Sequence, residues 1–180
     1  MKLFENDVVY DFPVTHTLSR LHSKYPNPFA THVYSVDTID RSIDTKTGIV
    51  RSERLIGVSQ GAPRWVTKLF KLPAIAYVRE VIFIDPSKTL ATSMSINLNL
   101  AQYVSCLELI TYSPHDNEST LFRQRALLVS SFPTKLVARR LEQVSLDRFK
   151  SNAGIGKQGF EWVLSRPGDV PSTTSGPCGL

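Results

Sequence analysis

The pattern of apolar and polar positions predicts a strand followed by a helix at the start of the chain. Residues 2–12 mix apolar and polar positions and stop at Pro13, which is typical of a strand at the edge of a sheet. Apolar residues then recur at helical spacing from Val14 to Tyr25. Pro26 ends this helix, because proline lacks the backbone donor that another turn requires.

Segments rich in β-branched residues, separated by turn signals, predict six further strands. The first two form a hairpin, because the turn sequence from Asp44 to Gly48 separates them. The last four follow one another at even spacing, which indicates an antiparallel meander. The predicted strands are residues 32–43, 48–58, 76–84, 89–98, 103–112 and 121–131.

The pattern changes after Pro133 and predicts one long C-terminal helix. Apolar residues from Thr134 to Leu164 keep helical spacing, and no proline interrupts them. This helix must bury its apolar face, and one face of the sheet is the available surface. We therefore expect an α+β fold in which a curved antiparallel sheet of about seven strands carries the helix across it, with a hollow between them. The domain spans residues 1–165, and the polar, proline-rich residues 166–180 are predicted to be a disordered tail.

Composition fits one globular domain. The chain has 180 residues, of which 42% are apolar and 21% charged, so it can bury a core. No stretch reaches the ~18 consecutive apolar residues of a membrane span. The first seven residues resemble neither a signal nor a transit peptide, so we expect no cleaved targeting segment. Cys106 and Cys178 are the only cysteines, which excludes a disulfide scaffold and a zinc site built on cysteine pairs.

The charge of the chain indicates an anionic partner. Lysine and arginine total 21 against 16 acidic residues, a formal net charge of +5. Residues 123–157 carry eight basic and two acidic residues. Phosphate, an acidic lipid surface and nucleic acid all fit this surplus, and a solvated helix face is the ordinary alternative. No RNP-type or helix-turn-helix pattern accompanies the charge, so nucleic acid is not the favoured partner.

Catalytic and cofactor motifs lack their required context. Gly154 to Gly159 spell G-x-G-x-x-G, but a helical run precedes them where a dinucleotide site needs a strand. The glycines therefore indicate close helix–sheet packing, fraying into a looser second segment, or room left for a ligand. Neither G-x-S-x-G nor H-E-x-x-H occurs among the serines and four histidines, so no hydrolase or metal site is predicted. We expect His16 and His22 on the solvent side of the first helix, His115 in a turn, and a structural role for His32.

Residues 60–75 interrupt the strands with a short amphipathic helix bracketed by Pro63 and Pro73. At helical spacing, Trp65, Leu69 and Leu72 share one face, while Arg64, Lys68 and Lys71 share another. This composition is typical of a helix lying on anionic lipid, and an amphipathic helix packed on the core is the alternative. Its shortness and its flanking prolines indicate a lid.

Motifs along residues 1–164 resemble the PRELI (slowmo-type) family of phospholipid-transfer proteins of the mitochondrial intermembrane space. Several matches occur in the family's order. They are Lys24 to Pro28, His32-Val33 with Asp37, Arg54-Leu55, Pro63 with Trp65, Val81 to Pro86, Thr111-Tyr112, Arg148-Phe149 with Asn152, and Gly159-Phe160.

The resemblance implies a helix-grip, START-like lipid cavity and a carrier, not an enzyme. Members carry phosphatidic acid or phosphatidylserine between membranes, need no cofactor or metal, and bind a small twin Cx9C helical partner. A lid occupies the place of residues 60–75, and its membrane contacts would be Trp65, Lys68, Leu69 and Phe70. A lipid-binding sensor that does not transfer its ligand is the alternative function.

The resemblance also assigns residues to the lipid headgroup. By position these are Lys24 and Arg148, with His32, Arg54 and Asn152 nearby. Phosphatidic-acid carriers of the family have lysines where this chain has Val58, Gly61 and Ile155. Their absence favours phosphatidylserine, while phosphatidic acid remains open.

Overall fold

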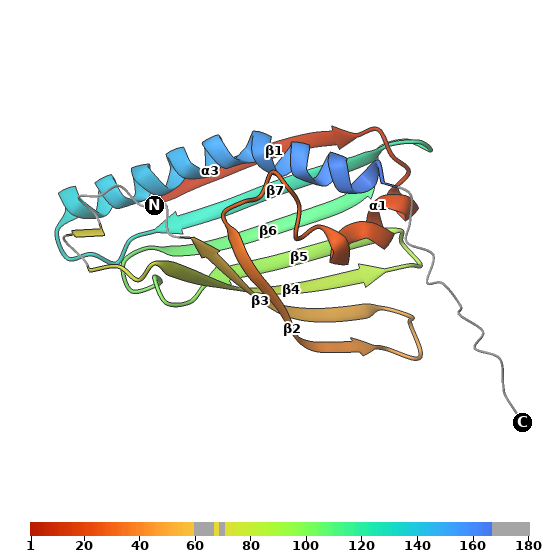
Figure 1. Ribbon diagram of the computed structural model, residues 1–180, viewed down its shortest axis with the longest axis horizontal. Coiled ribbons are helices and arrows are strands. Elements are labelled where there is room, and N and C mark those ends of the chain that lie inside the picture. Colours follow the sequence, from red (N-terminus) through yellow and green to blue (C-terminus); the bar gives the residue numbers. More distant parts are fainter. Residues whose placement is uncertain (60–66, 69–70, 167–180) are drawn as a thin grey trace, which may run out of the picture.

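A computed structural model describes residues 1–59, 67–68 and 71–166 of the chain (Figure 1). One seven-stranded antiparallel sheet carries a long helix across one face. The strand order is β1-β7-β6-β5-β4-β3-β2. The elements are β1 (Lys2–Tyr10), α1 (Val14–Arg20), the 3₁₀ turn η1 (Leu21–Ser23), β2 (Val33–Ile43), β3 (Val50–Ser59), β4 (Ile75–Asp85), β5 (Leu90–Asn97), β6 (Ser105–Pro114), β7 (Thr120–Val129) and α3 (Lys135–Leu164).

The sheet is the predicted meander, with the first strand added at its far edge. Strands β2 to β7 each pair with the next strand along the chain, and β1 pairs with β7. The predicted hairpin is confirmed: β2 and β3 are joined by a turn in which the Gly48 amide donates to the Asp44 carbonyl at 2.8 Å. Gly48 has φ +73°, a conformation that glycine adopts without steric cost.

On this face of the sheet, α3 lies over the strands nearest the β1 edge. It packs directly on β1 and β7, and its C-terminal end contacts α1 (Figure 1). The glycine-containing stretch 154–159 continues the helix without a break, as the pattern predicted. Because α3 rests mainly on these two strands, it contacts the inner face of the remaining strands chiefly at its C-terminal end.

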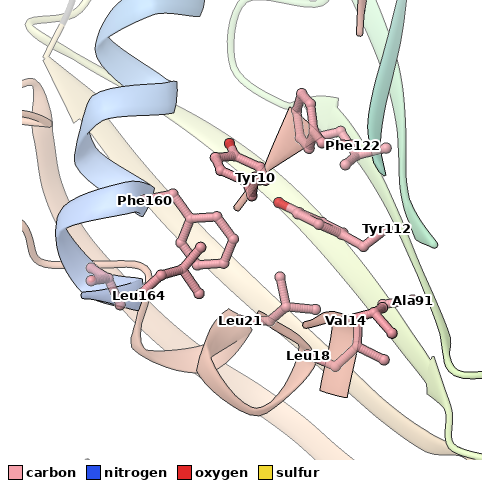
Figure 2. Packing of buried hydrophobic residues seen from close by; sticks show 11 residues of the cluster. Tyr10, Val14, Leu18, Leu21, Ala91, Tyr112, Phe122, Phe160 and Leu164 are labelled. Carbon is pink, nitrogen blue, oxygen red and sulfur yellow. The ribbon is translucent and has the colours of Figure 1, made fainter. Parts of the chain in front are cut away.

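Aromatic side chains form the main core at the C-terminal end of α3 (Figure 2). The Phe160 ring lies 5.5 Å from the Tyr10 ring and 5.9 Å from the Tyr112 ring, in edge-on arrangements that suit aromatic pairs. Leu18 and Leu21, from α1 and η1, close this cluster from below. A second, smaller cluster joins Phe4 and Leu128 to Leu146 of α3. The helix is thus fixed at two places along its length.

Two expectations about the first helix are wrong. The helix ends at Arg20 and tightens into η1, instead of continuing to Tyr25. His16 and His22 do not face solvent: each is half-buried, with Nε2 2.8 Å from the Leu164 carbonyl and 2.9 Å from the Ser52 hydroxyl, respectively. The helical pattern could not show this, because α1 is enclosed by α3 and the sheet.

The predicted lid helix and tail fall largely outside the described residues. Of residues 60–75, Thr67 and Lys68 are described as helical, and Lys68 is exposed. Trp65, Leu69 and Phe70 lie outside the described residues, as does the tail from residue 167. Within the described part of the chain, no helix combines the length and hydropathy that crossing a bilayer requires.

Candidate functional site: a cavity beneath the C-terminal helix

A cavity of about 730 Å³ separates α3 from the inner face of the sheet. Ligand sites in proteins occupy roughly 300–1,000 Å³, so this hollow is at the upper end of that range. Its walls are mainly apolar, and the side chains of the described residues leave the hollow open. Among the residues that line it are Val8, Ile56, Val58, Val78, Val104, Leu128, Leu141, Val144 and Phe149.

Glycines of α3 serve two different purposes around the cavity. Gly156 lines it, and a Cβ atom at this position would meet nothing within 4 Å. A Cβ atom at Gly159 would lie 2.7 Å from Oδ1 of Asn27, so this glycine permits a close approach of the helix to the loop after η1. Gly156 therefore agrees with room left for a ligand, whereas the close packing at Gly159 is against a loop and not against the sheet.

Lys24 lies at the deep end of the cavity, directly after η1. Its Nζ is 5.5 Å from the Phe160 ring centroid and 5.6 Å from the Tyr25 ring centroid, which are cation–π distances. Burial raises the pKa of Tyr10 and of Tyr112, so both phenols beside the ammonium stay neutral. No carboxylate in the described ranges forms an ion pair with Lys24, which leaves its charge available to a ligand.

Asn27 holds the loop that carries Lys24. Its Nδ2 donates to the Lys24 carbonyl at 2.8 Å, and its Oδ1 accepts from the Ala30 amide at 2.9 Å and the Phe29 amide at 3.0 Å. These bonds fix the loop beneath Gly159. The position of the ammonium is therefore set by the contact between loop and helix.

Arg54 lies beside this end of the cavity but does not line it. Only 2% of its surface is exposed, and its Nε and Nη2 donate to Glu80 Oε2 at 2.8 and 2.6 Å. Ser93 donates to the other Glu80 oxygen at 3.0 Å. Arg54 lines a small adjoining pocket with Lys24, and its charge is compensated by Glu80.

Arg148, His32 and Asn152 line the other half of the same cavity. Arg148 Nη2 donates to the Ser59 carbonyl at 3.1 Å, at the end of β3. Burial lowers the pKa of Arg148, and burial together with the charge of Arg148 lowers the pKa of His32. On α3, twelve positions separate Arg148 from the Phe160 ring that contacts Lys24, roughly 18 Å at the rise of an α-helix. The structure thus places the predicted cations at two levels of one cavity.

Sequence reasoning missed a polar row on the cavity floor. Gln124 Nε2 and Ser95 Oγ donate to the two oxygens of Glu108 at 2.5 and 2.9 Å. Asn6 Nδ2 donates to Gln124 Oε1 at 3.2 Å, which extends the row onto β1. The available signal was polar residues at inward positions of predicted strands, since alternate residues share a face.

A cysteine thiol and a metal site are the other candidate groups to consider in the cavity. Burial raises the pKa of the Cys106 thiol to about 12, so it stays protonated and is a poor nucleophile. Within the described ranges, no three His, Cys, Asp or Glu side chains gather as a metal site requires.

A profile of the PRELI-like family matches residues 17–169. The chain belongs to this family. Protein UPS2, mitochondrial, of Saccharomyces cerevisiae is 35% identical over 91% of this chain and 73% of its own length. A UPS-like protein of Schizosaccharomyces pombe is 36% identical over 92% of this chain and 90% of its own. PRELI domain-containing protein 1, mitochondrial, of Gallus gallus is 29% identical over 90% and 76%.

Solved structures share the fold of this PRELI-like chain at low sequence identity. The Zhui aromatase/cyclase from a Streptomyces species matches with a TM-score of 0.65 and 11% identity, over 92% of this chain and 94% of that one. Ara h 8.0201 matches with a TM-score of 0.57 and 12% identity, over 92% and 99%. These likenesses confirm the expected helix-grip, START-like fold.

Proposed function

We propose that this protein carries an anionic phospholipid, phosphatidylserine or phosphatidic acid, between mitochondrial membranes across the intermembrane space. The observation that carries the proposal is the unfilled apolar cavity with a cation at each of two levels. Membership of the PRELI-like family and relatives named as mitochondrial proteins support it.

The energetics of lipid extraction require such a cavity. Exposing the roughly 30 methylene groups of two acyl chains to water would cost about 25 kcal/mol, at ~0.8 kcal/mol each. A carrier avoids this cost by replacing the bilayer interior with apolar side chains. Binding must also stay close in free energy to the bilayer, because the lipid has to leave again.

Each step of transfer is assigned to particular residues in this proposal. Exposed basic residues bring the protein to an anionic membrane, and residues 60–75 enter the interface through Trp65, Lys68, Leu69 and Phe70. The acyl chains slide beneath α3, while the phosphate pairs with Lys24 or Arg148. His32 and Asn152 lie within the same cavity, whereas Arg54 acts by fixing Glu80 beside Lys24.

The headgroup preference leans toward phosphatidylserine. Two of the positions where phosphatidic-acid carriers have lysines hold apolar residues here: Val58, which lines the cavity, and Ile155, which is 38% exposed. Neither residue supplies a positive charge. A phosphodiester carries less negative charge than a phosphate monoester and needs fewer cations. The lipid leaves chemically unchanged in this proposal, which mass spectrometry of the lipid after incubation tests.

In the same proposal, the protein binds a small helical partner of the twin Cx9C type. The outer face of the sheet, opposite α3, exposes apolar side chains that would otherwise meet water. Leu107 and Leu109 of β6 lie opposite Ile96 and Met94 of β5 in the sheet register, and all four are more than a third exposed. Such a patch is typical of an interaction surface.

A cavity-filling variant tests the carrier function. Gly156→Phe places a ring in the cavity and should abolish transfer of labelled phosphatidylserine between vesicles. Gly154→Phe is the matched control, because Gly154 is an exposed position of the same helix that does not line the cavity. Equal transfer by both folded variants would contradict the proposal. Lipid bound to the wild-type protein in native mass spectrometry, without vesicle-to-vesicle transfer, would favour the sensor instead.

A further inference from the structure

Glu108 is a carboxylate on the cavity floor whose donors are all neutral. Its oxygens accept from the Ser95 hydroxyl at 2.9 Å and from the Gln124 amide at 2.5 Å. No lysine, arginine or histidine in the described ranges forms an ion pair with it. Glu80, across β5 in the same row of the sheet, differs because Arg54 compensates its charge.

An uncompensated carboxylate is a disadvantage in a cavity built only for phosphate and acyl chains. A fixed carboxylate repels a second anion that is brought near it, and a phosphate is such an anion. The hydrogen bonds from Gln124 and Ser95 nevertheless hold both oxygens in place, and Asn6 in turn holds Gln124. A ligand that brings a cation to this position removes the disadvantage.

We propose that Glu108, held by Gln124 and Ser95, binds the ammonium group of the headgroup and makes the carrier selective for aminophospholipids. This inference rests on the proposed function and names the residue that selects the headgroup. Lys24 and Glu108 then bind the two opposite charges of one headgroup.

The spacing along β6 agrees with binding of the phosphate at Lys24 and of the ammonium at Glu108. Ile110 and Tyr112 line the pocket that Lys24 shares, and they lie two and four residues beyond Glu108. At about 3.4 Å per residue, Ile110 and Tyr112 lie roughly 7 and 14 Å from Glu108 along the strand. Glu80, which lines the same pocket, lies in the row of Glu108 itself. The pocket that holds Lys24 therefore begins beside Glu108, so one serine headgroup, in which two carbon atoms separate the ammonium from the phosphate oxygen, is expected to reach both groups at hydrogen-bond distances of about 2.8 Å.

The test compares two lipids of equal net charge. Phosphatidylserine and phosphatidylglycerol are both monoanionic phosphodiesters, but only the first has an ammonium group. In vesicle-to-vesicle transfer by the full chain, Glu108→Gln should lower the ratio of phosphatidylserine to phosphatidylglycerol transfer roughly 10- to 100-fold, the effect of losing a hydrogen bond between charged groups. Glu118→Gln is the control: it removes the same charge from an exposed turn outside the cavity. Thermal unfolding verifies that both variants fold.

A second measurement uses the unmodified protein. N-acylated phosphatidylserine keeps the phosphate and the carboxylate but carries an uncharged amide, so it should compete for binding at least about tenfold less well than phosphatidylserine. An unchanged lipid ratio in folded Glu108→Gln, or equal competition by the acylated lipid, overturns only the role of Glu108 and leaves the proposed function in place. Failure of the wild-type protein to carry any of these lipids overturns the proposed function and this inference together.

Discussion

At the scale of single residues, Lys24 determines which charge the deep end of the cavity accepts. Its ammonium has aromatic rings and neutral phenols around it, and Glu80, the carboxylate beside it, is already paired with Arg54. A phosphate placed there gains a charge-assisted hydrogen bond, which is stronger than one between neutral groups. Arg54 is also a cation, but its pairing with Glu80 means that it is not available to bind a phosphate.

We predict that Lys24→Met loses lipid transfer while the protein remains folded. The rate for phosphatidylserine should fall at least about tenfold, because a hydrogen bond between charged groups contributes roughly 1.5–3 kcal/mol. Stability should change little, because the lost cation–π contacts with Tyr25 and Phe160 are offset by removal of the desolvation cost of the ammonium. Lys46→Met in the exposed turn between β2 and β3 is the control. Wild-type transfer by Lys24→Met would show that the lysine does not bind the headgroup.

A pair of glycine substitutions tests the contact between α3 and the loop after η1. Gly159→Ala should reduce the free energy of unfolding by about 1–2 kcal/mol, because the new methyl group displaces Asn27, whose side chain is held by three hydrogen bonds. Gly154→Ala meets nothing within 4 Å and should increase stability by up to about 1 kcal/mol through helix propensity. Urea unfolding measures both changes. Equal stabilisation by the two alanines would mean that the close contact at Gly159 is not maintained in solution.

At the scale of elements, the hydrophobic pattern predicted nearly all of the strands and α3. Strands alternate inward and outward residues with a period of two, and helices repeat at 3.6, so both leave a local signal in the sequence. The first helix was the exception, because the burial of its residues depends on α3, which lies more than 100 positions later in the chain. The inward polar residues of β5, β6 and β7 were visible in the sequence, but their hydrogen bonds depend on which strands are neighbours.

The outer face of β5 and β6 provides a prediction about the partner. Leu107→Lys with Leu109→Lys should abolish co-purification with a small helical partner, because two charges replace apolar contacts at the centre of the patch. Lipid binding inside the cavity should persist, since these side chains point away from it. Tyr34→Lys is the control, because Tyr34 is an exposed residue of the edge strand β2, three strands away from β5. Retention of the partner by the double variant would exclude this face as the interface.

At the scale of the whole molecule, the cavity and the net charge of +5 act at different stages of transfer. Exposed basic residues of α3, such as Lys135, Arg139 and Lys150, attract the protein to an anionic bilayer over a long range. The cations inside the cavity act only on a lipid that has already entered. Surface attraction is screened by salt, whereas contacts inside the cavity are screened much less.

Salt should therefore slow transfer without emptying the cavity. When ionic strength rises from about 0.05 to 0.5 M, the transfer rate between anionic vesicles should fall severalfold, because the screening length shortens below about 5 Å. The fraction of protein with bound lipid, measured after rapid removal of vesicles, should stay the same. Acceptor vesicles of neutral lipid serve as the control and should show little dependence on salt. A salt-independent rate with anionic vesicles would indicate that the basic surplus has no part in membrane approach.

The sequence by itself determined the order and type of the elements, the edge position of the first strand, the hairpin and the long final helix. These features follow from local periodicity and from prolines and glycines at turns, which need no knowledge of distant neighbours. Only the tertiary structure decided that Arg54 is paired with Glu80, that Lys24 and Arg148 lie at different levels, and that Glu108 has neutral donors alone. The physical reason is that the interactions of a charge depend on every group that folding brings within a few ångströms, and these groups come from strands and helices far apart in the chain.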